Sequence, residues 1–337
     1  MKTRFLILMI IGICIRLVLA YFFYGNYDQE SYQVVADIVR SGGNVYAKTE
    51  RYNYAPTWSF ILTALSFIQI PFQFAVRSLL TLVDIFLAIL IIKISGKEYL
   101  GILFFLNPVS ILITGYHGQF DNLAVLPLLI AVIIQKRNGS SWSIFLLGTL
   151  SILIKHITIF AVIAIFFSVT KHKRRAILML LGSALIFLIS FLPYIPEGSN
   201  NILHRVFLYS GTFKPYSPFL LIPFWTTPLF AIVMLMFIYL FRKKPIENQI
   251  QNSFLVFLTF APGISEQYFV LPVIIGSLFP KFGYYLFSII TFIFLMGSEN
   301  NLSLPIPSTW FSVWIAVLIW LINSSGFILR ENKIPND

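Results

Sequence analysis

The sequence predicts an all-α, polytopic membrane protein, and three observations carry this prediction. Of the 337 residues, 58% are hydrophobic and only 11% are charged, whereas about a quarter of the residues in a soluble domain are charged. The mean hydropathy is +0.84. Apolar runs follow one another along the chain, many near the roughly 20 residues that span a bilayer core. We expect a single integral membrane domain over residues 1–337, a helical bundle with about 12 transmembrane helices.

The net charge of +11 does not indicate a nucleic-acid partner, because the cations form short clusters between apolar runs instead of one basic face. Such clusters are typical of topology signals. The single cysteine, Cys14, lies inside the first apolar run, which excludes disulfides and cysteine metal sites. Arg16 interrupts the same run and no small-residue cleavage pattern follows, so we expect a retained helix instead of a signal peptide.

The predicted spans are taken from these apolar runs in chain order. They lie near 5–23, 78–95, 98–115, 119–135, 141–154, 156–170, 174–192, 219–241, 250–264, 268–280, 282–297 and 309–329. Several are short for a crossing. The segment 57–70 is also apolar, but Pro56 and Pro71 bracket it and it is too short to cross comfortably.

The distribution of positive charge decides whether 57–70 crosses. If it does not, and the amino terminus is cytoplasmic, sixteen of the 24 cations fall on the cytoplasmic side, including the clusters within 171–175 and 242–244. A crossing at 57–70 would move both clusters outside, against the positive-inside rule. We therefore predict an interfacial helix at 57–70 within an external loop, and we expect the functional groups on this outer face.

The external stretch 25–56 contains carboxylates and cations together. Asp28 and Glu30 follow the first apolar run, and Lys48 and Arg51 precede an aromatic run that ends at Pro56. A carboxylate at this place could accept a proton from an attacking hydroxyl or hold a divalent cation. The combination indicates work on a polar, phosphorylated substrate. The alternative is a solvated hairpin between two membrane helices.

Two further polar clusters lie at the ends of apolar runs. The sequence GYHGQFDN, residues 115–122, places His117, Gln119 and Asp121 at a membrane edge, where polar groups are costly without a use. Lys155 and His156 interrupt two apolar runs without a turn residue and need an anion beside them in lipid. A phosphate suits this pair. The alternative is that Lys155 snorkels to the interface.

Four more residues complete the candidates. PGISEQYF, residues 262–269, places Glu266 and Gln267 at the outer end of a short span, although a simple polar turn would give the same pattern. Arg16 and Asp84 fall inside spans at a similar depth, roughly 10 Å below the outer surface at ~1.5 Å per residue. We predict that these two form a structural ion pair.

Four stretches carry a resemblance to a known family. They are YDQESYQVVADIVRSGGNVYAKTERYNYAP, LVDIFLAILIIKIS, NPVSILITGYHGQFDNLA and LSILIKHI, with PGISEQYF as a later match. Together they resemble the GT-C superfamily of glycosyltransferases, and within it the mannosyltransferases that use a polyprenyl- or dolichyl-phosphate sugar, such as the catalytic subunit of GPI mannosyltransferase I. The resemblance implies a GT-C type bundle with an external catalytic loop at 24–77, core helices at 78–170, and variable helices on the acceptor side at 171–337.

The resemblance also implies roles for individual residues. Asp28 would be the catalytic base, with Glu30 as the alternative, because the relatives tend to carry D-x-D where this chain has Asp28-Gln29-Glu30, and an alignment on Tyr32-Gln33 shifts the match by one position. The donor phosphate would be bound by Lys155, His156, Arg51 and Arg205, and the substrate by Tyr54, His117, Gln119, Asp121, Glu266 and Gln267. The metal requirement stays open between none and a divalent cation, Mg²⁺ or Mn²⁺.

On this resemblance the chain would transfer a hexose, in the first place mannose, from a polyprenyl-phosphate sugar to a glycolipid or glycan acceptor at the extracytoplasmic or ER-luminal face. The absence of a glycine-rich nucleotide loop agrees with a lipid-phosphate donor. A transporter or flippase of lipid-linked saccharides is the alternative function, although internal repeats typical of transporters are not evident. A third alternative is an inactive scaffold subunit, whose outer polar groups would pair among themselves.

Overall fold

The structure is a computed structural model that describes residues 3–170, 172–208, 226–298 and 310–325, and in these ranges the regular elements are helices and no β-strand occurs. The first half contains α1 (Thr3–Phe22), α2 (Tyr27–Arg40), α3 (Val45–Lys48), α4 (Pro56–Leu65), α5 (Phe72–Ser95), α6 (Glu98–Phe105), α7 (Pro108–Ser110), the π-helical turn η1 (Ile111–Tyr116), α8 (Asp121–Lys136) and α9 (Ser141–Ile154). The predicted all-α fold is confirmed for this part of the chain.

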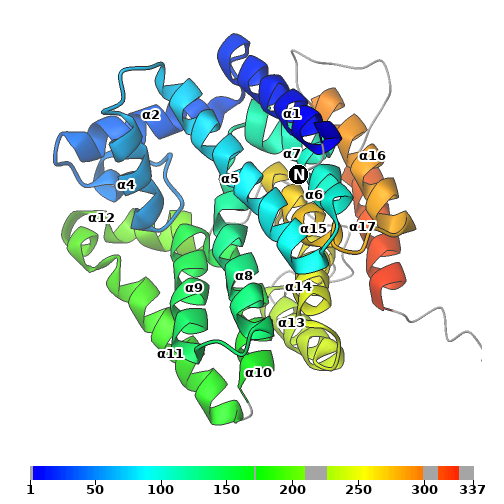
Figure 1. Cartoon of the computed structure of the whole chain (residues 1–337). Helices are drawn as coiled ribbons and strands as arrows, with labels where there is room; N and C mark the ends of the chain where they lie inside the picture. Colours follow the sequence, from blue (N-terminus) through cyan, green and yellow to red (C-terminus); the bar gives the residue numbers. More distant parts are fainter. Residues whose placement is uncertain (1–2, 171, 209–225, 299–309, 326–337) are drawn as a thin grey trace, which may run out of the picture.

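The second half continues the same pattern. It contains η2 (His156–Thr158), α10 (Ile159–Val169), α11 (Lys173–Ile189), η3 (Leu192–Tyr194), α12 (Ile195–Asn201), η4 (Ile202–Phe207), α13 (Thr226–Phe241), α14 (Ile246–Phe260), η7 (Glu266–Phe269), α15 (Val270–Gly276), α16 (Phe282–Ser298) and α17 (Trp310–Ser325). Figure 1 shows α2 and α4 as a separate layer beside α5, on the side of the molecule where α12 lies.

Three helices are long and apolar enough to cross a membrane. They are Thr3–Phe22, Phe72–Ser95 and the continuous helical stretch Lys173–Phe207. Glu98–Phe105 and Pro108–Tyr116 would make a fourth span if the pair, bent by 46°, crosses as one. The other apolar helices have 10–17 residues. The chain thus has the helices of an integral membrane protein, and the number of twelve crossings stays a prediction.

Some sequence predictions fall partly or wholly outside the described ranges. These are the beginning of the span 219–241, both ends of 309–329, and the predicted cytoplasmic cations Lys2, Lys171, Arg330 and Lys333.

The segment predicted as interfacial forms a short helix. α4 begins with Pro56 at its first turn, where a missing N–H costs nothing, and it ends at Leu65, followed by a turn. Trp58 and Leu62 are buried, whereas Phe60 on the opposite side is exposed. α4 therefore has one face packed on the protein and one apolar face on the outside, and its ten residues are too few to span a bilayer.

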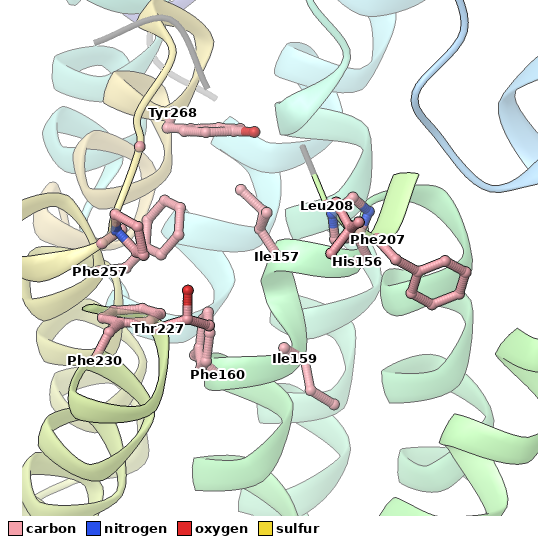
Figure 2. A pocket seen from close by; sticks show the side chains of 13 residues that line it. His156, Ile157, Ile159, Phe160, Phe207, Leu208, Thr227, Phe230, Phe257 and Tyr268 are labelled. Carbon is pink, nitrogen blue, oxygen red and sulfur yellow. The ribbon is translucent and has the colours of Figure 1, made fainter. Parts of the chain in front are cut away.

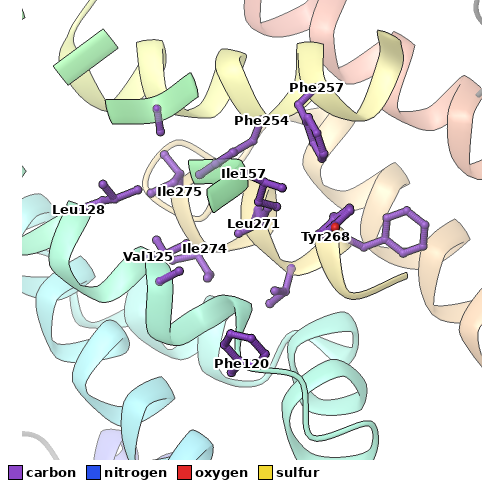
Figure 3. Packing of buried hydrophobic residues seen from close by; sticks show 14 of the residues in the cluster. Phe120, Val125, Leu128, Ile157, Phe254, Phe257, Tyr268, Leu271, Ile274 and Ile275 are labelled. Atoms are coloured by element: carbon purple, nitrogen blue, oxygen red, sulfur yellow. The ribbon is translucent and has the colours of Figure 1, made fainter. Parts of the chain in front are cut away.

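Apolar side chains join α8, α14 and α15 in the centre of the molecule. Figure 3 shows Val125 and Leu128 of α8 facing Leu271, Ile274 and Ile275 of α15, and all five are buried. In a membrane protein such contacts stabilise the bundle through van der Waals packing. This packing fixes α15, and with it the preceding turn η7, against the start of α8.

The predicted ion pair between Arg16 and Asp84 is confirmed. Arg16 Nη2 lies 3.1 Å from Asp84 Oδ2, and both side chains are fully buried. Asp84 also accepts hydrogen bonds from Thr114 at 2.7 Å and from Asn122 at 2.8 Å. A buried charge is stabilised only when its hydrogen-bonding capacity is used. This network joins α1, α5, η1 and α8 below the loops that follow α1 and η1.

Arg77 of α5 fixes the path of the chain from α1 to α2. Its guanidinium donates to the carbonyl oxygens of Phe23 at 2.7 Å and Leu19 at 3.2 Å, and it also contacts the Tyr24 carbonyl. Leu19 is in the last turn of α1, and Phe23 and Tyr24 directly follow the helix. A cation at this end of a helix is favoured by the helix dipole. Gly25 then turns with φ +85°, a conformation that favours glycine. Together these contacts set the starting point of α2.

The sidedness prediction can be checked by cysteine labelling. Asn44 beside α3 donates to the Tyr194 carbonyl at 2.9 Å, and Asn201 of α12 donates to the Tyr46 carbonyl at 2.7 Å, so α3 and α12 lie side by side. Both helices should therefore face the outside together.

In a chain whose Cys14 is replaced by alanine, cysteines at the exposed Ser41 and Ser199 should react with an impermeant thiol reagent added outside. A cysteine at Ser95 should react only after the membrane is permeabilised. The reverse pattern would contradict the predicted topology.

Candidate functional site

Asp28 lies in the first turn of α2, at the entrance to the external loop. Asn26 caps this helix, because its side-chain oxygen accepts from the Asp28 N–H at 3.2 Å. The Asp28 side chain is half-buried, and its Oδ2 accepts a hydrogen bond from Gln119 Nε2. The capped helix start and the amide from a distant loop hold the carboxylate in one position.

Tyr32 orients the Gln119 amide toward Asp28. The Tyr32 hydroxyl donates to Gln119 Oε1 at 3.1 Å. Because the oxygen is occupied by a donor, the NH₂ end of the amide is left to face the carboxylate. Tyr32 follows Asp28 by four residues and thus lies on the same face of α2. This residue was missed by the sequence analysis, and the helical period of α2 could have identified it.

The loop that carries Gln119 is itself tightly held. Gly118 has φ +67°, and a Cβ there would lie 2.2 Å from Gln29 Nε2. Gln29, buried on α2, donates to the carbonyl oxygens of His117 at 2.7 Å and Gly118 at 3.3 Å. The π-helical turn η1 precedes this loop, and such turns are frequent at functional sites. Glycine is therefore required at 118 for the loop to pack on α2.

Lys155 and Asp121 form a buried ion pair. Lys155 Nζ lies 2.5 Å from Asp121 Oδ2, with side-chain exposures of 1% and 0%. The helix breaks at Lys155, which is extended between α9 and η2, and this break directs the side chain inward. Lys155 does not reach the surface, as snorkelling would require. The anion that we expected beside it is supplied within the chain by Asp121, although the sequence suggested a phosphate.

Three aromatic rings surround the Lys155 ammonium. Nζ lies 4.7 Å from the ring centre of Phe120 and 5.2 Å from those of Tyr54 and Tyr268. Rings at this distance attract a cation. Tyr54 comes from the external loop, Phe120 from the start of α8 and Tyr268 from η7. The ammonium is therefore the point at which three predicted motifs meet.

The two arginines proposed as phosphate ligands also have carboxylate partners. Arg51 lies 3.0 Å from Glu30 and stacks over the Tyr27 ring at 4.5 Å, and Arg205 pairs with Glu50. Lys48 and Arg51 lie in the same external loop as Asp28. The cation that acts on Asp28 is instead Lys155, because Arg51 points toward Glu30.

The histidines occupy different surroundings. His117 Nδ1 lies 3.3 Å from Asn26 Nδ2 and 3.8 Å from Glu266 Oε2, which connects η7 to the start of α2. Burial lowers the pKa of His117 to about 4, and the positive charge of Arg77 acts in the same direction. At neutral pH this imidazole is therefore uncharged. His156 is half-buried and lines a separate apolar cavity.

Two cavities have lining residues that contact Lys155. The smaller one, about 170 Å³, is polar, and its lining comprises Tyr27, Asp28, Ser31, Tyr32, Glu50, Arg51, Asn53, Tyr54, Arg205, Ser265 and Gln267. The larger one, about 370 Å³, is lined mainly by apolar side chains. Figure 2 shows Tyr268, Phe257 and Phe230 on one side of this larger cavity, and His156, Ile157 and Phe207 on the other.

Adjacent residues of η7 line the two cavities. Gln267 lines the polar cavity and the next residue, Tyr268, lines the apolar one. Lys155 contacts the Tyr54 ring of the first and the Tyr268 ring of the second. A molecule with a polar head and an apolar chain could therefore place its two ends in the two cavities, with its junction near Lys155.

The structure brings the twelve predicted site residues into one connected region. Asp28, Arg51, Tyr54, Arg205 and Gln267 line the polar cavity, and Glu30, Gln119 and Lys155 each contact one of these five. Asp121 pairs with Lys155, His156 lines the apolar cavity, and His117 lies 3.8 Å from Glu266, the residue before Gln267. The sequence analysis did not identify Glu50, Ser31, Asn53 or Ser265, which carry no motif of their own and join the site only through folding.

Asp28 and Glu30 do not act as a pair. Asp28 faces Gln119, whereas Glu30 faces Arg51 and lies 3.4 Å from the Tyr24 hydroxyl. Among the residues that the structure describes, no group of three or more histidine, cysteine, aspartate or glutamate side chains could hold a metal ion. Of the two carboxylates, only Asp28 lines the polar cavity.

Burial raises the pKa of the Asp28 carboxyl above its ordinary value. The hydrogen bond from Gln119 and the positive charge of Lys155 oppose this increase. A carboxylate with a raised pKa is a stronger base than an exposed aspartate, provided that the pH stays above that pKa. Asp28 therefore has the position and the basicity to accept a proton from a group in the polar cavity.

Comparison with known proteins adds no family assignment. No protein-family model matches the chain, and no curated protein matches it significantly. The chemistry proposed below therefore depends on the residues themselves and on the resemblance of their motifs.

Proposed function

We propose that this protein is a membrane glycosyltransferase that moves a hexose, in the first place mannose, from a polyprenyl-phosphate sugar to a glycolipid or glycan acceptor on the outer or luminal face. One observation carries the proposal. Asp28 lines a polar cavity, and the Lys155 ammonium contacts both the Tyr54 ring of this cavity and the Tyr268 ring of a larger apolar cavity. This arrangement suits a donor with a polar sugar phosphate and a long apolar chain.

The residues of the polar cavity can support the transfer step. An acceptor hydroxyl oxygen would form a bond to the anomeric carbon, and the bond from that carbon to the phosphate oxygen would break. Asp28 would take the hydroxyl proton, and the phosphate would leave with one more negative charge. Arg51 and Arg205 line the same cavity, and cations placed where negative charge develops are a large source of catalysis.

Lys155 and His156 would bind the donor phosphate in the region between the two cavities. Because Lys155 is already paired with Asp121, we expect a phosphate to share the ammonium with that carboxylate instead of meeting a free cation. Tyr54, His117, Gln119, Asp121, Glu266 and Gln267 would hold the sugar or keep the loops around it in place. A Mg²⁺ or Mn²⁺ requirement stays open and is tested by adding each ion after chelation.

The pH dependence of transfer follows from the raised pKa of Asp28. A general base must be ionised, so the transfer rate should fall as the pH decreases through a pKa above the ordinary aspartate value. Gln119→Leu removes a hydrogen bond that lowers this pKa, and it should move the acid limb of the rate profile to higher pH. An acid limb that does not move in an active Gln119→Leu protein would contradict the assignment of Asp28.

A transfer assay tests the proposed function. Purified protein in liposomes is offered several polyprenyl-phosphate hexoses and a mixed glycolipid acceptor, and released polyprenyl phosphate is measured. We expect release with at least one donor, with the greatest rate for mannose. A scaffold subunit would release none with any donor. The outer polar groups do pair among themselves, as a scaffold would require, so activity and not structure separates these two alternatives.

A further inference from the structure

A groove lies between α9 and α11, and it shares no lining residue with the two cavities near Lys155. Its volume is about 340 Å³, and it is lined by Ser141, Trp142 and Phe145 of α9 and by Arg175, Leu178, Met179 and Gly182 of α11. They lie in the amino-terminal part of α9 and in the first three turns of α11. The groove is therefore apolar along its length and has one guanidinium among its walls.

Gly182 keeps the groove open. A Cβ at this position would lie 3.3 Å from the Phe145 ring, so any longer side chain would enter the space between the helices. Trp142 is 69% exposed and Leu178 is 58% exposed. Apolar side chains with this exposure are typical of a surface that contacts lipid.

Arg175 lies where positive charge is already concentrated. Lys173, Arg174 and Arg175 occupy the first turn of α11, which contains no acidic residue. Cations are disfavoured at a helix amino terminus, because the helix dipole places positive charge there. No carboxylate of the described residues forms an ion pair with Arg175. An anion that binds here would compensate the positive charges of Lys173, Arg174, Arg175 and the helix amino terminus.

We propose that the groove binds one anionic phospholipid, with its phosphate on Arg175 and an acyl chain along Phe145, Leu178 and Gly182. A neutral lipid would fill the apolar part but leave the charge of Arg175 uncompensated, and a soluble anion would leave the apolar part exposed. Only an amphipathic anion satisfies both ends of the groove. Basic pockets between membrane helices bind anionic headgroups in this manner. The site is separate from the proposed transfer chemistry.

Native mass spectrometry of the full-length protein tests this proposal. The protein in a neutral detergent is titrated with phosphatidylglycerol or phosphatidylcholine, and the bound lipids are counted. We expect one tightly bound phosphatidylglycerol and weaker binding of phosphatidylcholine. Arg175→Gln should weaken phosphatidylglycerol about tenfold, the effect of one charge-assisted contact. Arg174→Gln removes the same charge from a residue outside the groove and should change the affinity less than about twofold.

Two further variants test the groove itself. Gly182→Leu fills the space and should remove the bound lipid, and Leu178→Glu, at an exposed position, places a like charge beside the phosphate and should do the same. The proposal is overturned if Arg174→Gln and Arg175→Gln weaken binding equally. It is also overturned if the Gly182→Leu and Leu178→Glu proteins both bind the lipid as tightly as the wild type. It is also overturned if inorganic phosphate at equal concentration displaces the lipid, since a soluble anion would then suffice.

Discussion

Asp28→Asn is expected to reduce transfer at least ~100-fold, which is the usual scale of general-base catalysis. Asparagine keeps the shape of the side chain and its place in the first turn of α2, but it cannot accept a proton at neutral pH. Donor binding and the melting temperature should stay close to those of the wild type, because Gln119 can still hydrogen-bond to the asparagine oxygen. Initial rates of polyprenyl phosphate release measure the effect.

Glu30→Gln is the matched control for this experiment. Glu30 lies two residues from Asp28 on the same helix, yet it faces Arg51 and is exposed at the surface. Removing its charge should change the transfer rate only severalfold. If Glu30→Gln abolishes transfer and Asp28→Asn does not, the base is Glu30 and the shifted motif alignment is correct. If neither variant changes the rate of an active protein, the external loop is not the catalytic centre.

Lys155→Ala is expected to have the second largest effect, and its first consequence is on stability. The substitution leaves the fully buried Asp121 carboxylate without its partner, and breaking a buried pair in this way destabilises a protein by about 3–5 kcal/mol. Thermal unfolding in detergent should show a large decrease in the melting temperature. An unchanged melting temperature would contradict the burial of this pair.

A double variant separates this structural role from donor binding. Asp121→Asn with Lys155→Met removes both charges at nearly constant volume, a change that is often neutral for stability. We expect the melting temperature of the double variant to return close to that of the wild type. Its donor affinity should remain weaker than that of the wild type by about 1–3 kcal/mol, the value of a charge-assisted contact. Wild-type donor affinity in the folded double variant would show that Lys155 only holds the site together.

Arg16 and Asp84 illustrate what the sequence could predict about the fold. Both are charged residues inside apolar runs, and their depth in the predicted spans was enough to pair them, as the structure confirms. The helical class and the position of a short helix after Pro56 were equally accessible, because hydropathy and proline positions are local signals. The number of crossings is not settled in the same way, since several apolar helices have fewer than 18 residues.

The partners within the site could not be predicted from the sequence. Lys155 pairs with Asp121, which lies 34 residues earlier in the chain, and the sequence analysis did not pair these two residues. Arg51 shares the external loop with Asp28, yet the turn of α2 directs Glu30 toward Arg51 and Asp28 toward Gln119. Glu50 and Arg205 are 155 residues apart. Such pairs depend on how helices pack, which local patterns do not encode.

The central claim is that the bond between the sugar and the lipid phosphate is broken at this site, and cleavage of that bond in sealed proteoliposomes tests it most directly. A polyprenyl-phosphate hexose with a labelled sugar is supplied together with a glycolipid acceptor. The account predicts that wild-type protein moves the label to the acceptor and releases polyprenyl phosphate, and that the Asp28→Asn protein does neither. If the labelled lipid instead crosses the bilayer intact and no polyprenyl phosphate appears, the protein is a flippase and the account is contradicted.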